Sequence, residues 1–139
     1  MGKFKTLIPD WNFSTDSEPN EIWVDLKGYV GTYQISSLGR MKTFNWRAQG
    51  KIMIVTPKVH QDGYLFYALT KDKKRTSQSA HRIVANNFLE KINGRNEVNH
   101  IDGIKTNDKI ENLEWVTHQE NMHHASVMKL WGKSKSKAA

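Results

Sequence analysis

The sequence predicts an α+β fold in which a small antiparallel β module precedes a unit of two strands and a helix. Three observations support this prediction. Short runs rich in β-branched and aromatic residues alternate with glycine-containing turns from Glu21 to Ala80. Residues 81–89 place apolar side chains on one helical face. Two further strand-like runs then lead to Thr117, where a helix-start signal stands.

The first half of the chain is predicted to consist mainly of strands. Residues 1–20 include Pro9 and Pro19 and show no sustained periodicity, so we expect an irregular arm. Regular structure is expected from Glu21 onward. The expected strands are residues 22–24, 33–35, 51–55, 64–69 and 76–80.

Turns and basic residues separate these strands. A turn at residues 36–39 leads to Arg40 and Lys42, and the basic stretch around Trp46 and Arg47 is expected to be poor in strands. The charged segment 70–75 should form a hairpin tip, because the runs on either side of it can pair.

The second half is predicted to run helix, strand, loop, strand, helix. A short helix at 81–89 should be followed by strands at 97–101 and 113–116, with a polar loop between them. Thr117 and Glu120 match the capping box, so the last helix should begin directly after Thr117 and end near Trp131.

The net charge of +7 is concentrated in the middle of the chain. Residues 40–82 contain ten Lys or Arg and two Asp, whereas the segments on either side are nearly balanced. A polyanion such as nucleic acid would therefore dock on the middle segment. A solvated basic surface that only keeps the protein soluble is the alternative.

Composition also limits the kind of protein. The chain has no cysteine, which excludes disulfides and zinc-thiolate sites, so any metal must be bound through oxygen and imidazole nitrogen. No apolar run reaches the roughly 18 residues of a membrane span, and the N-terminus lacks the order of a signal peptide. We expect a soluble, intracellular protein with no membrane partner.

Four polar residues in the last third suit a metal site beside a general base. If the first strand of the pair lies against the last helix, the amide oxygens of Asn99 and Asn121 can face one hard divalent cation. The imidazole of His100 can take a proton from water near neutral pH. Asn112 can hold the polar loop beside that ring through hydrogen bonds to the loop backbone. Each residue alone could merely satisfy turn hydrogen bonds, and their joint spacing favours a site.

Two further histidines are candidates. His124 lies three residues after Asn121 on the same helix face and could contact phosphate or metal, although a solvated helix histidine is the alternative. His81 begins a helix with an apolar face, so it supports the core or contacts DNA, and we favour the core.

These residues stand in stretches that resemble the HNH endonucleases of phages and mobile introns, which share the ββα-metal (His-Me finger) fold. The matching stretches are His81–Ala85, Val98–Gly103, Glu111–Thr117 and Glu120–Asn121. The letters of the family name fall on His100, Asn112 and Asn121, with Asn in place of the last His. Upstream, Trp23, Gly28–Tyr29 and Tyr33–Arg40 resemble the small module that often precedes the HNH domain and helps to dock it on DNA.

The resemblance implies a DNA endonuclease that hydrolyses phosphodiester bonds with one metal ion. Asn99 and Asn121 would bind the cation, magnesium with manganese as the alternative, while His100 would activate water and Asn112 would keep the loop in register. Many relatives have Asp at position 99, so weaker metal binding is expected here, with Asp102 as a nearby carboxylate.

The resemblance also divides the chain into four segments. We expect an irregular arm at 1–20, a β-rich DNA-docking module at 21–75, an HNH nuclease domain at 76–131 and a disordered basic tail at 132–139. The expected partner is double-stranded DNA, bound by a monomer, in the host cytoplasm if the gene is a phage gene. The candidate DNA contacts are Arg40, Lys42, Trp46, Arg47, Lys73, Lys74, Arg75 and Arg82.

Three hypotheses about function follow. The first is a homing-type phage or intron endonuclease that nicks DNA. The second is a non-catalytic DNA-binding protein that has kept the fold and lost its metal chemistry through Asn99. The third is a sequence-tolerant phage nuclease.

Overall fold

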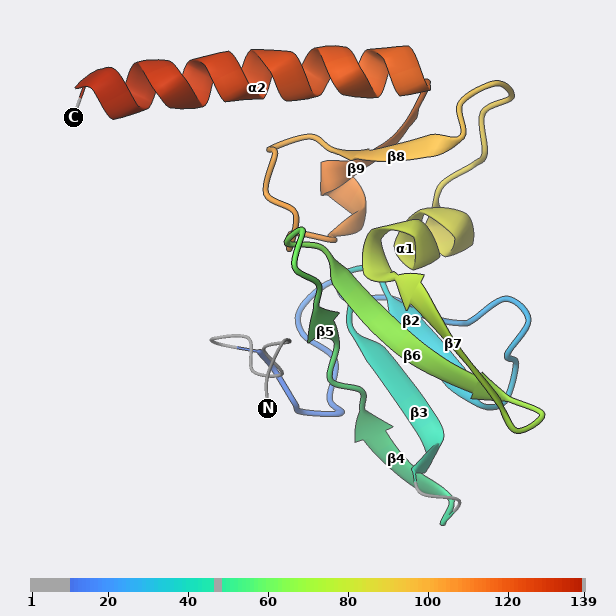
Figure 1. The fold of residues 1–139 in the computed structure, drawn as a ribbon. Helices are drawn as coiled ribbons and strands as arrows, with labels where there is room; N and C mark the ends of the chain where they lie inside the picture. The colour runs from blue at the N-terminus through green and yellow to red at the C-terminus, as the bar shows by residue number, and fades with distance from the viewer. Residues whose placement is uncertain (1–10, 47–48, 139) are drawn as a thin grey trace.

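The computed structural model describes residues 11–46 and 49–138, and it contains three antiparallel sheets and two α-helices (Figure 1). The first sheet has the order β1-β2-β3-β4, the second β5-β6-β7 and the third β8-β9. The strands are β1 (Trp23–Asp25), β2 (Tyr33–Ser36), β3 (Met41–Trp46), β4 (Lys51–Ile54), β5 (Lys58–Val59), β6 (Leu65–Lys71), β7 (Lys74–Ser79), β8 (Glu97–His100) and β9 (Leu113–Val116). The helices are α1 (Ala80–Phe88), the 3₁₀ turn η1 (Ile110–Asn112) and α2 (His118–Ala138).

Helix α1 joins the two halves of the molecule. In Figure 1 it lies between the β8–β9 pair above and the two larger sheets below, and it contacts β2, β6 and β7 as well as β8, η1 and β9. Its Ile83 and Val84 are buried in one hydrophobic cluster that contains Ile35 and Tyr67 from the larger sheets and Trp115 from β9. Burial of this shared apolar surface fixes the β8–β9 pair against the N-terminal sheets.

The predicted fold class is confirmed, and so is the start of α2. Thr117 N donates to Glu120 Oε1 at 2.9 Å, and Glu120 N donates to Thr117 Oγ1 at 3.0 Å, so both halves of the capping box are present. The hairpin tip between β6 and β7 is also as predicted, with Asp72 and Lys73 in the left-handed region that suits a two-residue hairpin turn.

Two strands were not predicted, and one of them occupies the stretch before Arg47 that was expected to be poor in strands. Strand β3 pairs with both β2 and β4, so it lies inside the first sheet. Its Met41 and Thr43 are buried while Lys42 between them is only half-buried, which is the alternation of a one-sided strand. Lys42, which stands between the two buried residues, and the basic residues on either side of the strand concealed this pattern. The short strand β5 was also missed.

Helix α2 extends further than predicted. It runs to Ala138, through the tail that was expected to be disordered from residue 132. Lysine and alanine have good helix propensity and no proline interrupts the segment, whereas Gly132 and the two serines of the segment weaken the helix. Over the described residues, none of the helices combines the length and the apolar character needed to cross a bilayer.

Candidate active site

A small cavity between β8, its following loop and α2 brings the predicted site residues together. It has a volume of about 210 Å³, and Asn99, His100, Asn121 and His124 line it. Asn99 and His100 are sequence neighbours, but β8 ends at His100, so the alternation of strand faces does not keep them apart. The convergence of the amides at 99 and 121 with the imidazole at 100 is therefore present in the structure. The chemical roles of these side chains stay predictions.

Two carboxylates orient the two amides. Asn99 Nδ2 donates to Glu114 Oε2, which lies opposite it on β9, and Asn121 Nδ2 donates to Glu97 Oε1, both at 2.8 Å. Each carboxylate can only accept, so each amide must present its nitrogen to the glutamate. No described group bonds either amide oxygen. The oxygens are thus the atoms left for another ligand.

His100 forms a buried pair with Asp108 from the polar loop. His100 Nε2 lies 2.7 Å from Asp108 Oδ1, and the two side chains are only 5% and 3% exposed. Burial raises the pKa of Asp108, and the hydrogen bond from His100 opposes that rise. Because Nε2 is engaged with Asp108, Nδ1 is the ring nitrogen left without a partner among the described residues.

The ring of His81 lies next to the ring of His100. The His81 ring is stacked on Tyr64 with 5.0 Å between centroids, and it lies 4.8 Å from the ring of His100. Burial, together with the nearby His100, lowers its pKa to about 4, so His81 is neutral at pH 7. This position agrees with our preference for a core role over a DNA contact.

Two segments of this chain match known protein-family models. The family model described as HNH endonuclease matches residues 78–123, and the model for the NUMOD4 motif matches residues 21–70. The chain therefore contains an HNH endonuclease domain preceded by a NUMOD4 motif. Its HNH domain carries the cavity, and its NUMOD4 motif comprises the first sheet and most of the second.

Two relatives illustrate the similarity. DNA endonuclease I-HmuI of Bacillus phage SP01 is 35% identical over 102 residues, which is 73% of this chain and 56% of that protein. An uncharacterized HNH endonuclease of Acanthamoeba polyphaga mimivirus is 39% identical over 92 residues, 66% of this chain and 26% of that protein. The chain therefore spans only part of the length of the relatives it matches.

A solved structure is similar as well. The structure titled "DNA binding and cleavage by the HNH homing endonuclease I-HmuI" aligns with a TM-score of 0.68 at 33% identity, over 78% of this chain and 59% of that chain. The HNH fold predicted from the sequence is the fold of this relative.

Two sets of side chains in this HNH domain could bind a metal ion. Ligand atoms of His81, His100 and Asp108 lie within 4.8 Å of one another, and imidazole-rich sets suit transition metals. His100 and Asp108 already bond each other, however, so this set is better explained as a hydrogen-bonded pair with His81 packed on it. The unbonded amide oxygens of Asn99 and Asn121 fit a hard cation such as magnesium.

Asn112 holds the polar loop closed, as predicted from its position. Its Oδ1 accepts from Asp102 N at 3.0 Å, and its Nδ2 donates to Asp102 Oδ1 and to Asn107 O, each at 2.9 Å. The Asp102 carboxylate is occupied by these bonds and by the backbone of Ile104. Asp102 is therefore not placed to supply the charge that Asn99 lacks, and Glu114 and Glu97 lie closer to the amides.

The candidate DNA-binding residues are spread over several surfaces. Lys73, Lys74 and Arg75 are exposed at the tip of the β6–β7 hairpin, and Arg82 is exposed on α1. Lys42 is half-buried, with its ammonium 4.0 Å from the centre of the Trp23 ring. The side chain of Trp46 and the whole of Arg47 lie outside the described residues.

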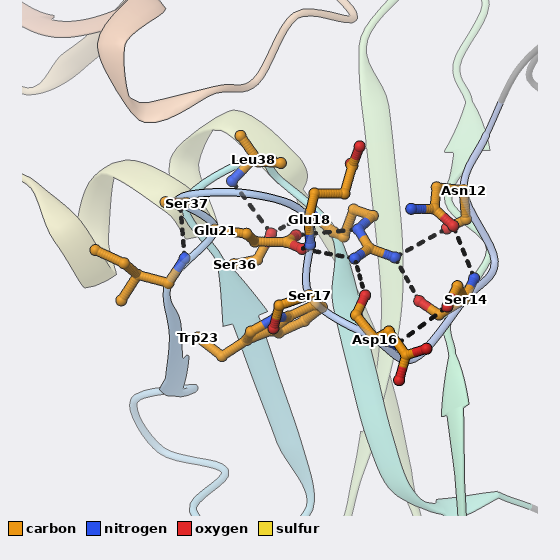
Figure 2. Close-up of polar contacts among 12 residues, drawn as sticks. Asn12, Ser14, Asp16, Ser17, Glu18, Glu21, Trp23, Ser36, Ser37 and Leu38 are labelled. Carbon is orange, nitrogen blue, oxygen red and sulfur yellow. Dashed lines mark hydrogen bonds and ion pairs between the residues drawn. The ribbon is translucent and has the colours of Figure 1, made fainter.

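The prediction of Arg40 as a DNA contact is wrong. Arg40 is 3% exposed, and its guanidinium bonds both carboxylate oxygens of Glu21, at 3.0 and 2.6 Å. The remaining donors reach the backbone carbonyls of Asn12, Ser14 and Asp16. In Figure 2 these residues of the N-terminal segment lie across the polar cluster from Glu21. Every donor direction is used by protein, so a phosphate has no access.

Three residues of the site were missed by sequence reasoning. Asp108, Glu97 and Glu114 touch His100, Asn121 and Asn99 respectively. The predicted strands at 97–101 and 113–116 placed Glu114 near Asn99 if they paired, but the long loop between them left the register open. Asp108 lies in an irregular loop, and no sequence periodicity indicates where its side chain points.

Proposed function

We propose that this protein is a metal-dependent DNA endonuclease that hydrolyses phosphodiester bonds. The observation that supports it is the convergence of His100, Asn99 and Asn121 on one cavity in the HNH domain. A base and two oxygen ligands on one small, open site suit attack by water on a phosphate held at the surface.

His100 would act as the general base. Its Nδ1 takes a proton from a water molecule as the water oxygen attacks the phosphorus. The bond from phosphorus to the 3′ oxygen breaks, and the departing oxygen takes a proton from solvent. The products are a 3′ hydroxyl and a 5′ phosphate, and His100 returns its proton to solvent.

Asn99 and Asn121 would hold the divalent cation through their amide oxygens, magnesium with manganese as the alternative. When bound there, the cation offsets negative charge that develops on the phosphate and on the departing 3′ oxygen. Glu114 and Glu97 keep the amide oxygens available and place two negative charges behind them. Asn112 keeps the loop that carries Asp108 closed.

The substrate that we propose is double-stranded DNA, approached by the basic hairpin tip and the exposed face of α1. One active site in the chain cuts one strand, so a nick is the expected product of a monomer. The relative I-HmuI is described as a homing endonuclease, and a homing-type role is the corresponding proposal here.

A plasmid-nicking assay tests this proposal. Supercoiled DNA should become open circles with magnesium. EDTA should abolish the conversion, and His100→Ala should slow it to a small residual rate. His123→Ala, which changes an exposed histidine on the same domain, is the matched control and should cleave like the wild type. DNA binding without cleavage in magnesium or manganese would favour the non-catalytic alternative.

Mapping the cut positions on a long duplex separates the two nuclease hypotheses. Cuts gathered at one or a few sequences support a homing enzyme. Cuts scattered over the duplex support a sequence-tolerant nuclease.

A further inference from the structure

Asp108 touches the one group that the proposed reaction uses as a base. Its Oδ1 lies 2.7 Å from His100 Nε2, and both side chains are almost completely buried. An ionised carboxylate only accepts hydrogen bonds, so this contact requires the proton of a neutral His100 to be on Nε2. Nδ1 then carries the lone pair, and it is the nitrogen that no described group bonds.

The N-terminal sheets, rather than the HNH domain alone, support Asp108. Gly39 lies in the turn between β2 and β3, and a Cβ added there would stand 3.0 Å from Asp108 Cβ and 3.3 Å from its carbonyl oxygen. Two residues further along the loop, Ile110 N donates to Ser37 O at 2.9 Å. The buried Tyr67 hydroxyl donates to Gly39 O at 2.7 Å and anchors the turn to the second sheet.

We propose that Asp108 is the positioning residue of His100, and that the turn at residues 36–39 holds Asp108 in place. The NUMOD4 motif then supports the catalytic base through Asp108, in addition to any contact that it makes with DNA. If the neutral tautomer of His100 is fixed before the reaction, no fraction of the enzyme is in the tautomer that lacks a lone pair on Nδ1, and the rate is higher for that reason. The inference rests on the proposed role of His100.

A spectroscopic measurement tests the pair without metal or substrate. Long-range proton–nitrogen spectra of the histidine rings, recorded in EDTA at neutral pH, report which ring nitrogen carries the proton. His100→Ala assigns the signal. The wild type should show His100 protonated on Nε2, and Asp108→Ala should give a mixture of tautomers. A wild-type His100 protonated on Nδ1, or a spectrum unchanged by Asp108→Ala, would overturn the proposal.

A double-mutant cycle separates positioning from general structural support. Asp108→Ala should lower kcat by about 10- to 100-fold with little change in KM. In the His100→Ala background it should cause no further loss, because Asp108 acts only through His100. A further loss in that background would place the effect elsewhere. A wild type that does not cleave at all would defeat the proposed function, while leaving the spectral result to decide on the pair.

A pair of glycine variants tests the contribution of the turn and does not depend on the Asp108 variant folding. Gly39 and Gly31 have nearly the same backbone angle, with φ of +88° and +86°, but only Gly39 has a neighbour where a Cβ would stand. Gly39→Ala should lower kcat and disturb the His100 tautomer, whereas Gly31→Ala should only lower the melting temperature. Equal effects of the two variants would remove the turn from the proposal, and an undisturbed His100 signal in Gly39→Ala would do the same.

Discussion

Glu114 accepts a hydrogen bond from the Asn99 amide nitrogen across the β8–β9 pair, at 2.8 Å, and so fixes which end of that amide faces away from it. A lone amide can rotate by half a turn and present either nitrogen or oxygen to a ligand. The carboxylate removes this freedom and adds a negative charge next to a neutral ligand. The arrangement gives a physical reason why Asn can occupy position 99, where many HNH relatives are expected to have Asp.

The first prediction concerns this pair. Glu114→Ala should raise the magnesium concentration for half-maximal cleavage by about 10- to 100-fold, because the Asn99 oxygen is no longer held and the nearby charge is lost. The measurement is the cleavage rate at saturating DNA over a magnesium titration. Glu111→Ala, an exposed carboxylate just before β9, is the control and should leave the titration unchanged. Equal magnesium requirements in wild type and Glu114→Ala would contradict the role given to Glu114.

The second prediction concerns Arg40, which is a structural residue. Arg40→Ala leaves the Glu21 carboxylate buried without its positively charged partner and frees the carbonyls of the N-terminal arm, so it should lower the free energy of unfolding by about 3–5 kcal/mol. Denaturant unfolding measures this loss. The control is Arg95→Ala, which removes an exposed ion pair with Glu120 and should cost less than about 1 kcal/mol.

Arg40→Ala also has an outcome for DNA binding. At a temperature where the variant is still folded, its DNA affinity and the salt dependence of that affinity should equal those of the wild type. A reduced salt dependence with unchanged stability would restore Arg40 as a phosphate contact.

Arg40 shows what the sequence could not indicate. Its place in a basic stretch predicted an electrostatic role, but burial depends on the arm that folds over it and on Glu21, nineteen residues earlier. The same limitation applies to Asp108, whose partner is defined by loop closure. Contacts made by irregular segments carry no periodicity that the sequence would show.

Local signals were sufficient elsewhere. The capping box at Thr117 positioned Asn121 on the first turn of α2, and the strand–loop–strand pattern positioned Asn99 and His100 at the end of β8. Both are set by residues within a few positions along the chain. Strand β3 was missed although its alternation is local, because Lys42 and the neighbouring Arg40 and Arg47 outweighed Met41 and Thr43 in the prediction.

The third prediction concerns the hairpin tip. Replacing Lys73, Lys74 and Arg75 with alanine should weaken DNA binding and reduce the slope of log affinity against log salt by roughly three, since each contact neutralises about one phosphate. The side chains are exposed, so the melting temperature should change little. Titrations of a fluorescent duplex in EDTA at several salt concentrations measure the slope. An unchanged slope would move the DNA interface away from this hairpin.

The fourth prediction concerns the stability of the fold in acid. The pKa of His81 falls from 6.5 to about 4 on folding, so between these values the unfolded chain binds a proton that the folded chain does not. Stability from this group is therefore fully present above pH 6.5 and is lost as pH falls toward 4, by about 2–3 kcal/mol in all.

The variant His81→Phe tests this prediction, because it keeps a ring against Tyr64 but cannot take up a proton. Its free energy of unfolding should rise relative to the wild type by that amount as the pH is lowered from 7 to 4. Denaturant unfolding of both proteins at each pH gives the difference directly, and because most other groups titrate alike in the two proteins, their effects cancel. Parallel pH profiles for the two proteins would mean that His81 is protonated in the folded state, and that the packing against His100 does not exclude its charge.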